Sequence, residues 1–142
     1  MKLLLPCALV AASLALDRCG GEEGERLVLP SGEIRVVDGD TVAHGTTSYR
    51  LTGFDTPETH RARCAAETAL GDRAARRLAQ LIGEAGALEL TVRARPDRYG
   101  RRLARAVAGN QEIGALLIAE GLARPYAGGA RQPWCGSGTG GS

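Results

Sequence analysis

The hydrophobic pattern of the chain changes period near Ala65, and this change limits the folds that are possible. Before it, apolar and polar residues alternate in short segments separated by turn residues, as half-buried strands do. After it, apolar residues recur at helical spacing and arginines occupy the opposite face. The predicted strands are 33–37, 42–44, 48–54, 88–93 and 103–108, and the predicted helices are 65–82 and a short segment after Asn110.

Five short strands with one intervening and one trailing helix predict a mainly β or α+β class. The best-fitting architecture is a five-stranded OB-type barrel with two helices. The first three strands form a meander, which brings Asp40 near Asp55. The length of 142 residues suits one core, and we assign the barrel domain to residues 32–136.

The N-terminal sixteen residues hold one cation and then an apolar run too short to cross a bilayer comfortably. This pattern predicts a signal peptide over 1–16 and a secreted or periplasmic protein. A lipoprotein signal needs small residues before Cys19, where Asp17 and Arg18 stand instead. We expect a flexible leader over 17–31 and a disordered tail over 137–142.

Two cysteines of the predicted domain, Cys64 and Cys135, stand far apart in the sequence. In an exported protein they form the natural disulfide pair, which contributes roughly 3–5 kcal/mol in the chain-entropy model. Zinc is the alternative, although the chain has no Cys-x-x-Cys, and His44 and His60 make a poor ligand set. Cys19 has no assigned partner.

The net charge of +2 does not by itself indicate a nucleic-acid-binding protein. Lys2 is the only lysine, so nearly all the cations are arginines, which suit bidentate contacts with phosphate or carboxylate. Alanine and glycine are also abundant, so base composition accounts for many of these arginines. Their positions must therefore identify the functional ones.

Charged residues gather at three predicted strand–turn junctions: Asp40, Arg50, Asp55, Glu58 and Arg101. Two aspartates at neighbouring strand ends suit a hard divalent cation, and calcium tolerates such irregular oxygen ligands. Arginines can hold phosphodiester oxygens, and a nearby carboxylate can accept the proton of an attacking water. The set predicts phosphodiester hydrolysis.

Four segments resemble, in order, the motifs of the thermonuclease (staphylococcal nuclease-like) family, and specifically its short exported bacterial branch. They read VVDGDTV at 36–42, YRLTGFDTPE at 49–58, DRYGR at 97–101 and EGLA at 120–123. The resemblance implies an OB-type barrel and a calcium-dependent nuclease that acts on DNA and RNA. The short connection from Glu58 to the helix and the absence of a third helix depart from the best-known member.

The resemblance also implies roles for individual residues. Asp40, Asp55 and the Thr56 backbone carbonyl would bind calcium, Arg50 and Arg101 would hold the phosphate, and Glu58 would be the general base. The substrate-binding residues would be Arg98, Tyr99 and Tyr126, the last of which lies in a segment that departs from the family pattern.

Two other functions remain open on the sequence. A noncatalytic OB-type module would bind nucleic acid without hydrolysis, and an exported calcium-binding module would bind no nucleotide. The complete set of charged residues favours the nuclease, which we expect to be a monomer without stable membrane association.

Overall fold

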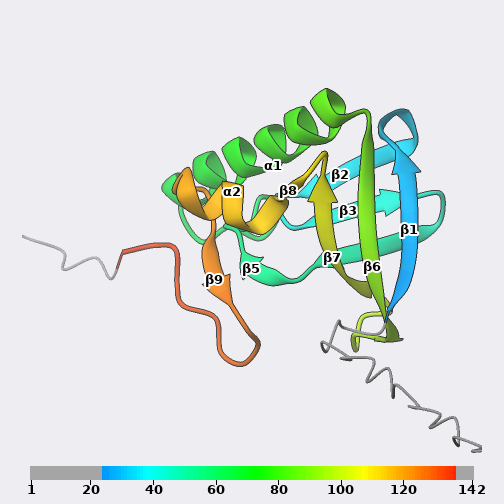
Figure 1. The fold of residues 1–142 in the computed structure, drawn as a ribbon. Helices are drawn as coiled ribbons and strands as arrows, with labels where there is room; N and C mark the ends of the chain where they lie inside the picture. Colours follow the sequence, from blue (N-terminus) through cyan, green and yellow to red (C-terminus); the bar gives the residue numbers. More distant parts are fainter. Residues whose placement is uncertain (1–23, 137–142) are drawn as a thin grey trace, which may run out of the picture.

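The computed structural model describes residues 24–136, which form a mixed β sheet curled into a half-barrel and two helices (Figure 1). This architecture confirms the predicted α+β fold of OB type. In chain order the elements are β1 (Glu25–Pro30), η1 (Ser31–Glu33), β2 (Ile34–Asp38), β3 (Thr41–His44), β4 (Thr47–Leu51), β5 (Gly53–Asp55), α1 (Ala65–Ala85), β6 (Ala87–Pro96), β7 (Arg102–Ala108), β8 (Gln111–Glu112), α2 (Ile113–Ala119) and β9 (Arg124–Tyr126). The predicted signal peptide, Cys19 and the predicted tail lie outside the described residues.

The main sheet has the strand order β1-β6-β7-β4-β3-β2, with β8 paired to β7. Strands β2, β3 and β4 pair antiparallel in sequence order, so the predicted meander is confirmed. Strand β4 then pairs parallel with β7, which joins the two halves of the sheet. Strands β5 and β9 form a second, two-stranded sheet.

The core lies between the curved sheet and the helices, and α1 runs across the sheet in Figure 1. Its largest fully buried side chains come from the sheet and from both helices: Phe54, Leu51, Leu78, Leu88, Leu90, Ile113 and Leu117. Burial of each such side chain stabilises the fold by about 1.5–3 kcal/mol. The alternating apolar residues of the strands therefore hold the sheet against the helices.

The predicted flexible leader is wrong for its last part, because residues 25–30 form strand β1. This strand pairs with β6 along six residues and exposes most of its side chains, including Val28. Backbone pairing at a sheet edge, rather than apolar alternation, holds it in place. Pro30 ends the strand at that edge, where a missing N–H is tolerated.

Three predicted boundaries also differ from the structure. The third strand is interrupted at Thr52, whose N–H and Oγ1 both donate to the Ala104 carbonyl, and β5 then pairs with a different partner. Helix α1 continues past Gly83 to Ala85, because Gly86, in the left-handed region, closes its C-terminus. The segment after Ala123 contains a strand, β9, that the sequence did not indicate.

Candidate nuclease site

The strand register brings the first three predicted site residues together. Thr41 and Arg50 lie opposite each other in the β3–β4 ladder, so Asp40 lies at the end of that ladder. The Leu51 N–H donates to the Asp40 carbonyl at 2.8 Å. Strand β5 follows β4 after one residue and places Asp55 beside the same end.

The Arg50 guanidinium lies between the carboxylates of Asp40 and Asp55, and all three residues are 5% exposed. Its Nη1 forms an ion pair with Asp40 Oδ2, and its Nη2 donates to Asp55 Oδ1 at 3.2 Å. Asp40 also accepts hydrogen bonds from Thr41 Oγ1 at 3.0 Å and from the Thr56 N–H at 3.2 Å. The result is a buried cluster of two acids and one base.

Burial, followed by the neighbouring positive charge of Arg131, lowers the pKa of Arg50 from its ordinary value to about 10. Asp55 acts in the opposite direction, and Arg101 adds another positive charge close enough to lower the pKa. Arg50 therefore remains protonated at neutral pH. The charges of Arg101 and Arg131 thus act on Arg50.

The donor atoms at this cluster fit a calcium ion. Asp40 and Asp55 supply carboxylate oxygens, and the adjacent Thr56 is buried. Carboxylate and carbonyl oxygens are the hard donors that calcium prefers. Thr56 Oγ1, which is buried without a hydrogen-bond partner within residues 24–136, is not one of them, because it lies beside Gly39, where an added Cβ would be 3.0 Å from it.

Glu58 lies next to the buried cluster on a segment fixed by helix α1. Gly71 of the helix faces this segment so closely that an added Cβ would lie 2.8 Å from the Pro57 carbonyl oxygen and 3.0 Å from that of Glu58. Thr59 Oγ1 donates to the Asp38 carboxylate just beyond. The Glu58 side chain remains 40% exposed, so water reaches it.

Arg101 is positioned by the turn that precedes β7. Asp97 accepts hydrogen bonds from the N–H groups of Tyr99 and Arg101 and from Arg101 Nε, each at 2.8–2.9 Å. Burial raises the pKa of Asp97, but these hydrogen bonds outweigh it and hold the pKa below its ordinary value. The carboxylate thus fixes both ends of the turn and the Arg101 side chain.

The predicted substrate-binding residues lie farther from the carboxylate cluster. Tyr99 is 66% exposed on the turn, and Arg98 Nη2 donates to its hydroxyl group at 2.5 Å. Tyr126 and Arg50 both line a cavity of about 800 Å³ between β5, β9, α2 and β7. Tyr126 is therefore connected to the cluster through this cavity. Tyr99 lies beside Arg101 instead, whose guanidinium carbon is 5.5 Å from the centre of the Tyr99 ring.

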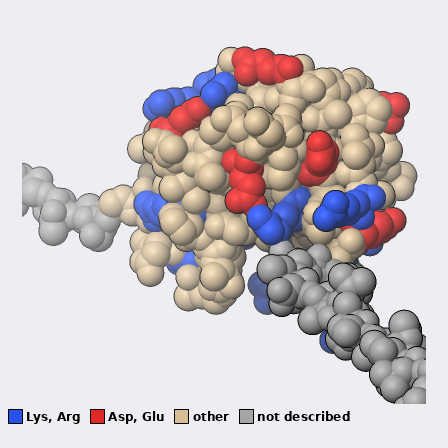
Figure 2. Space-filling view, in the orientation of Figure 1, with Lys and Arg blue, Asp and Glu red and all other residues tan. Residues whose placement is uncertain are grey.

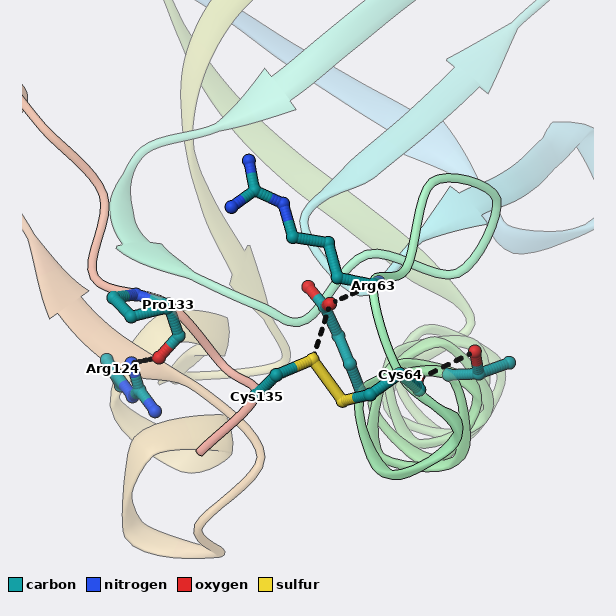
Figure 3. Close-up of a disulfide and its surroundings, with 7 residues drawn as sticks. Arg63, Cys64, Arg124, Pro133 and Cys135 are labelled. Carbon is teal, nitrogen blue, oxygen red and sulfur yellow. Dashed lines mark hydrogen bonds between the residues drawn. A yellow bond between two sulfur atoms is a disulfide. The ribbon is translucent and has the colours of Figure 1, made fainter. Parts of the chain in front are cut away.

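The predicted disulfide between Cys64 and Cys135 is present, so these sulfur atoms are not thiolates available to zinc (Figure 3). It fastens the segment 127–136, which we call the strap, beside the start of α1. After β9 the strap doubles back along that strand in Figure 1. Arg124 Nη1 also donates to the Pro133 carbonyl oxygen at 3.0 Å.

The strap adds two residues to the site that the sequence did not indicate. Arg131 Nη1 donates to Glu58 Oε1 at 3.0 Å, and its Nε lies 3.3 Å from Asp55 Oδ1. Trp134 Nε1 donates to Asp55 Oδ2 at 3.3 Å. The available signal was the disulfide itself, because Cys64 follows Glu58 by six positions and thus draws the residues before Cys135 to the site.

Acidic and basic side chains are interspersed on the face drawn in Figure 2, where no broad field of one sign is visible. The local cluster, rather than overall charge, must therefore provide any binding of an anionic substrate. In the part of the chain that the structure describes, no helix is long and apolar enough to cross a membrane.

Residues 48–133, more than half of the chain, match the family model described as staphylococcal nuclease homologue. The matched region begins in β4 and ends in the strap, so it includes the candidate site residues other than Asp40 and Trp134. No curated protein sequence matches the chain.

Proposed function

The chain belongs to the staphylococcal nuclease homologue family, and on this premise we propose that it is a calcium-dependent nuclease of DNA and RNA. The buried cluster of Asp40, Arg50 and Asp55 supports this proposal most strongly. Three carboxylates, those of Asp40, Asp55 and Glu58, contact two guanidinium groups, those of Arg50 and Arg131, which leaves one surplus negative charge at a partly desolvated place. A divalent cation at this place compensates that charge.

Asp40, Asp55 and the Thr56 carbonyl would hold the calcium ion, which when bound supplies Lewis-acid stabilisation of charge on the phosphate. Arg50 and Arg101 donate hydrogen bonds to the phosphate oxygens and stabilise the charge that builds up on them. Arg50 suits this role because its pKa of about 10 keeps it cationic at neutral pH.

Glu58 accepts a proton from the attacking water, whose oxygen bonds to phosphorus while the bond to the leaving sugar oxygen breaks and that oxygen takes a proton from solvent. A general base needs access to water, and the Glu58 side chain is partly exposed. Arg98 and Tyr99 contact the nucleotide phosphate, and Tyr126 stacks on the base.

We also propose that the protein belongs to the exported branch of the family and acts as a monomer outside the cytoplasm. The disulfide supports this location, because such bonds persist in oxidising compartments. The N-terminal pattern of one cation and an apolar run agrees with it.

Digestion of single-stranded DNA and of RNA, with calcium and with the chelator EGTA, tests the proposal. We expect cleavage of both polymers in calcium and none in EGTA. Unchanged cleavage in EGTA would refute the calcium assignment. Salt-dependent binding without cleavage in calcium would instead identify a noncatalytic nucleic-acid-binding module.

A further inference from the structure

A second cavity, of about 430 Å³, is lined by Asp55, whereas the neighbouring Phe54 lines the cavity that contains Tyr126. Its walls come from the loop between Glu58 and Cys64 and from the strap. Asp55 and Glu58 are among its lining residues, so the cavity adjoins the candidate site. The disulfide joins its two walls, because Cys64 ends the loop and Cys135 ends the strap.

Two arginines of the loop, Arg61 and Arg63, line this cavity with their side chains exposed. Within residues 24–136, neither guanidinium has a hydrogen-bond or ion-pair partner. Figure 3 shows the Arg63 side chain extending away from the disulfide, while only its backbone N–H donates to Glu67, at 2.7 Å. The other charged groups of the cavity are already occupied.

Those occupied groups are Asp55 and Glu58, which bind Arg131, and Glu67, which accepts the Arg63 N–H. Two unpaired cations therefore remain for a ligand. Trp134, whose ring packs 3.6 Å from the Arg124 guanidinium carbon, forms part of the opposite wall. Cations beside an aromatic wall suit a nucleotide, whose phosphate and base they contact separately.

Resting on the proposed nuclease function, we propose that this cavity is a subsite for the nucleotide next to the one whose bond is cleaved. Arg61 and Arg63 bind its phosphate, and the strap forms the wall against which the nucleotide lies. A single strand then crosses the site from the Tyr126 cavity, past Asp55 and Glu58, into the strap cavity.

The chain provides its own reporter for this test, because Trp134 is the only tryptophan in the sequence. Oligothymidylates of two and four nucleotides are titrated in EGTA, and Kd is read from Trp134 fluorescence over a range of salt concentrations. The chelator prevents turnover if the proposed function holds. Binding to the subsite is thus measured apart from cleavage.

The double variant Arg61→Gln/Arg63→Gln should bind the tetranucleotide about tenfold more weakly than the wild type. Its slope of log K against log salt should fall by about 0.7, the value for one phosphate contact on a single strand. Dinucleotide binding should change little. The matched control, Arg73→Gln/Arg76→Gln, removes the same charge from exposed positions on α1 and should leave both quantities unchanged.

Equal effects from the two double variants, or no effect from either, would overturn the subsite. Reduction of the disulfide should also weaken tetranucleotide binding, and unchanged binding after reduction would exclude the strap as its wall. The subsite and the nuclease can fail separately. If the salt slopes of the wild type and of Arg61→Gln/Arg63→Gln differ as expected but calcium supports no cleavage, only the nuclease activity is refuted. If the wild type cleaves but the two salt slopes are equal, only the subsite is refuted.

Discussion

Arg131 Nη1 lies 3.0 Å from Glu58 Oε1, although 73 positions separate the two residues. The same guanidinium reaches Asp55, so a residue of the disulfide-held strap binds both a proposed calcium ligand and the proposed base. Both oxygens of Asp55 are occupied, since Arg50 and Arg131 contact Oδ1 and Trp134 donates to Oδ2. A metal ion must therefore compete with the strap for this carboxylate.

Arg131→Gln should raise the affinity for calcium about threefold to tenfold, because one competing cation is removed from Asp55. The Arg131 side chain is 37% exposed, so solvent screening limits the effect. Isothermal titration with calcium measures the change. Arg73→Gln is the control for the loss of one positive charge. If Arg131→Gln binds calcium no more tightly than the wild type, Arg131 does not compete with calcium for Asp55.

Gly71→Ala should destabilise the fold by about 1–3 kcal/mol, because the new Cβ would press on the carbonyl groups of Pro57 and Glu58. Gly83→Ala, in the same helix, is its matched control, since a Cβ there meets nothing within 4 Å. The control should stabilise the protein by about 0.5–1 kcal/mol through helix propensity. Urea unfolding of both variants checks the pair, and equal effects of the same sign would refute the close packing.

Asp97→Asn should lower the free energy of unfolding by about 1–2 kcal/mol at pH 7, because the carboxylate accepts several hydrogen bonds in the turn. The folded-state pKa of Asp97 is lowered, so its contribution is present above the unfolded pKa of about 3.9 and is lost as pH falls through the folded pKa.

The difference between Asp97→Asn and the wild type should therefore be largest above about pH 5 and should shrink below about pH 3. Chemical unfolding at pH 7 and at pH 3 measures it. A difference that stays constant between these pH values shows that the charge of Asp97 does not stabilise the turn.

Reduction of the disulfide should lower the free energy of unfolding by about 4 kcal/mol, as expected for a closed loop of this length. The two cysteines are separated by 71 positions, so the cross-link restricts much of the unfolded chain. Urea unfolding with and without a reductant measures the loss. In the Cys64→Ala/Cys135→Ala variant the reductant should have no effect, and a similar loss there would assign the change to another cysteine.

The sequence predicted the residues that are positioned by strand register and failed where contacts come from the chain ends. Asp40, Arg50 and Asp55 stand beside strands whose alternation is visible, so their convergence follows from the meander. Strand β1 has an alternation too weak to indicate it, because only Leu29 of its six residues is buried. Arg131 and Trp134 reach the site through the disulfide, and no periodicity signals that kind of contact.

The role of Glu58 as the general base is tested by the rate at which Glu58→Gln cleaves single-stranded DNA, compared with the wild type at the same saturating calcium concentration. Glutamine keeps the size of the side chain but cannot accept the proton. Equal thermal unfolding midpoints of the two proteins serve as the control that the variant is folded. We expect clear cleavage by the wild type and a rate at least about 100-fold lower in the variant. Rates within about threefold of each other would contradict the assignment of Glu58 as the general base.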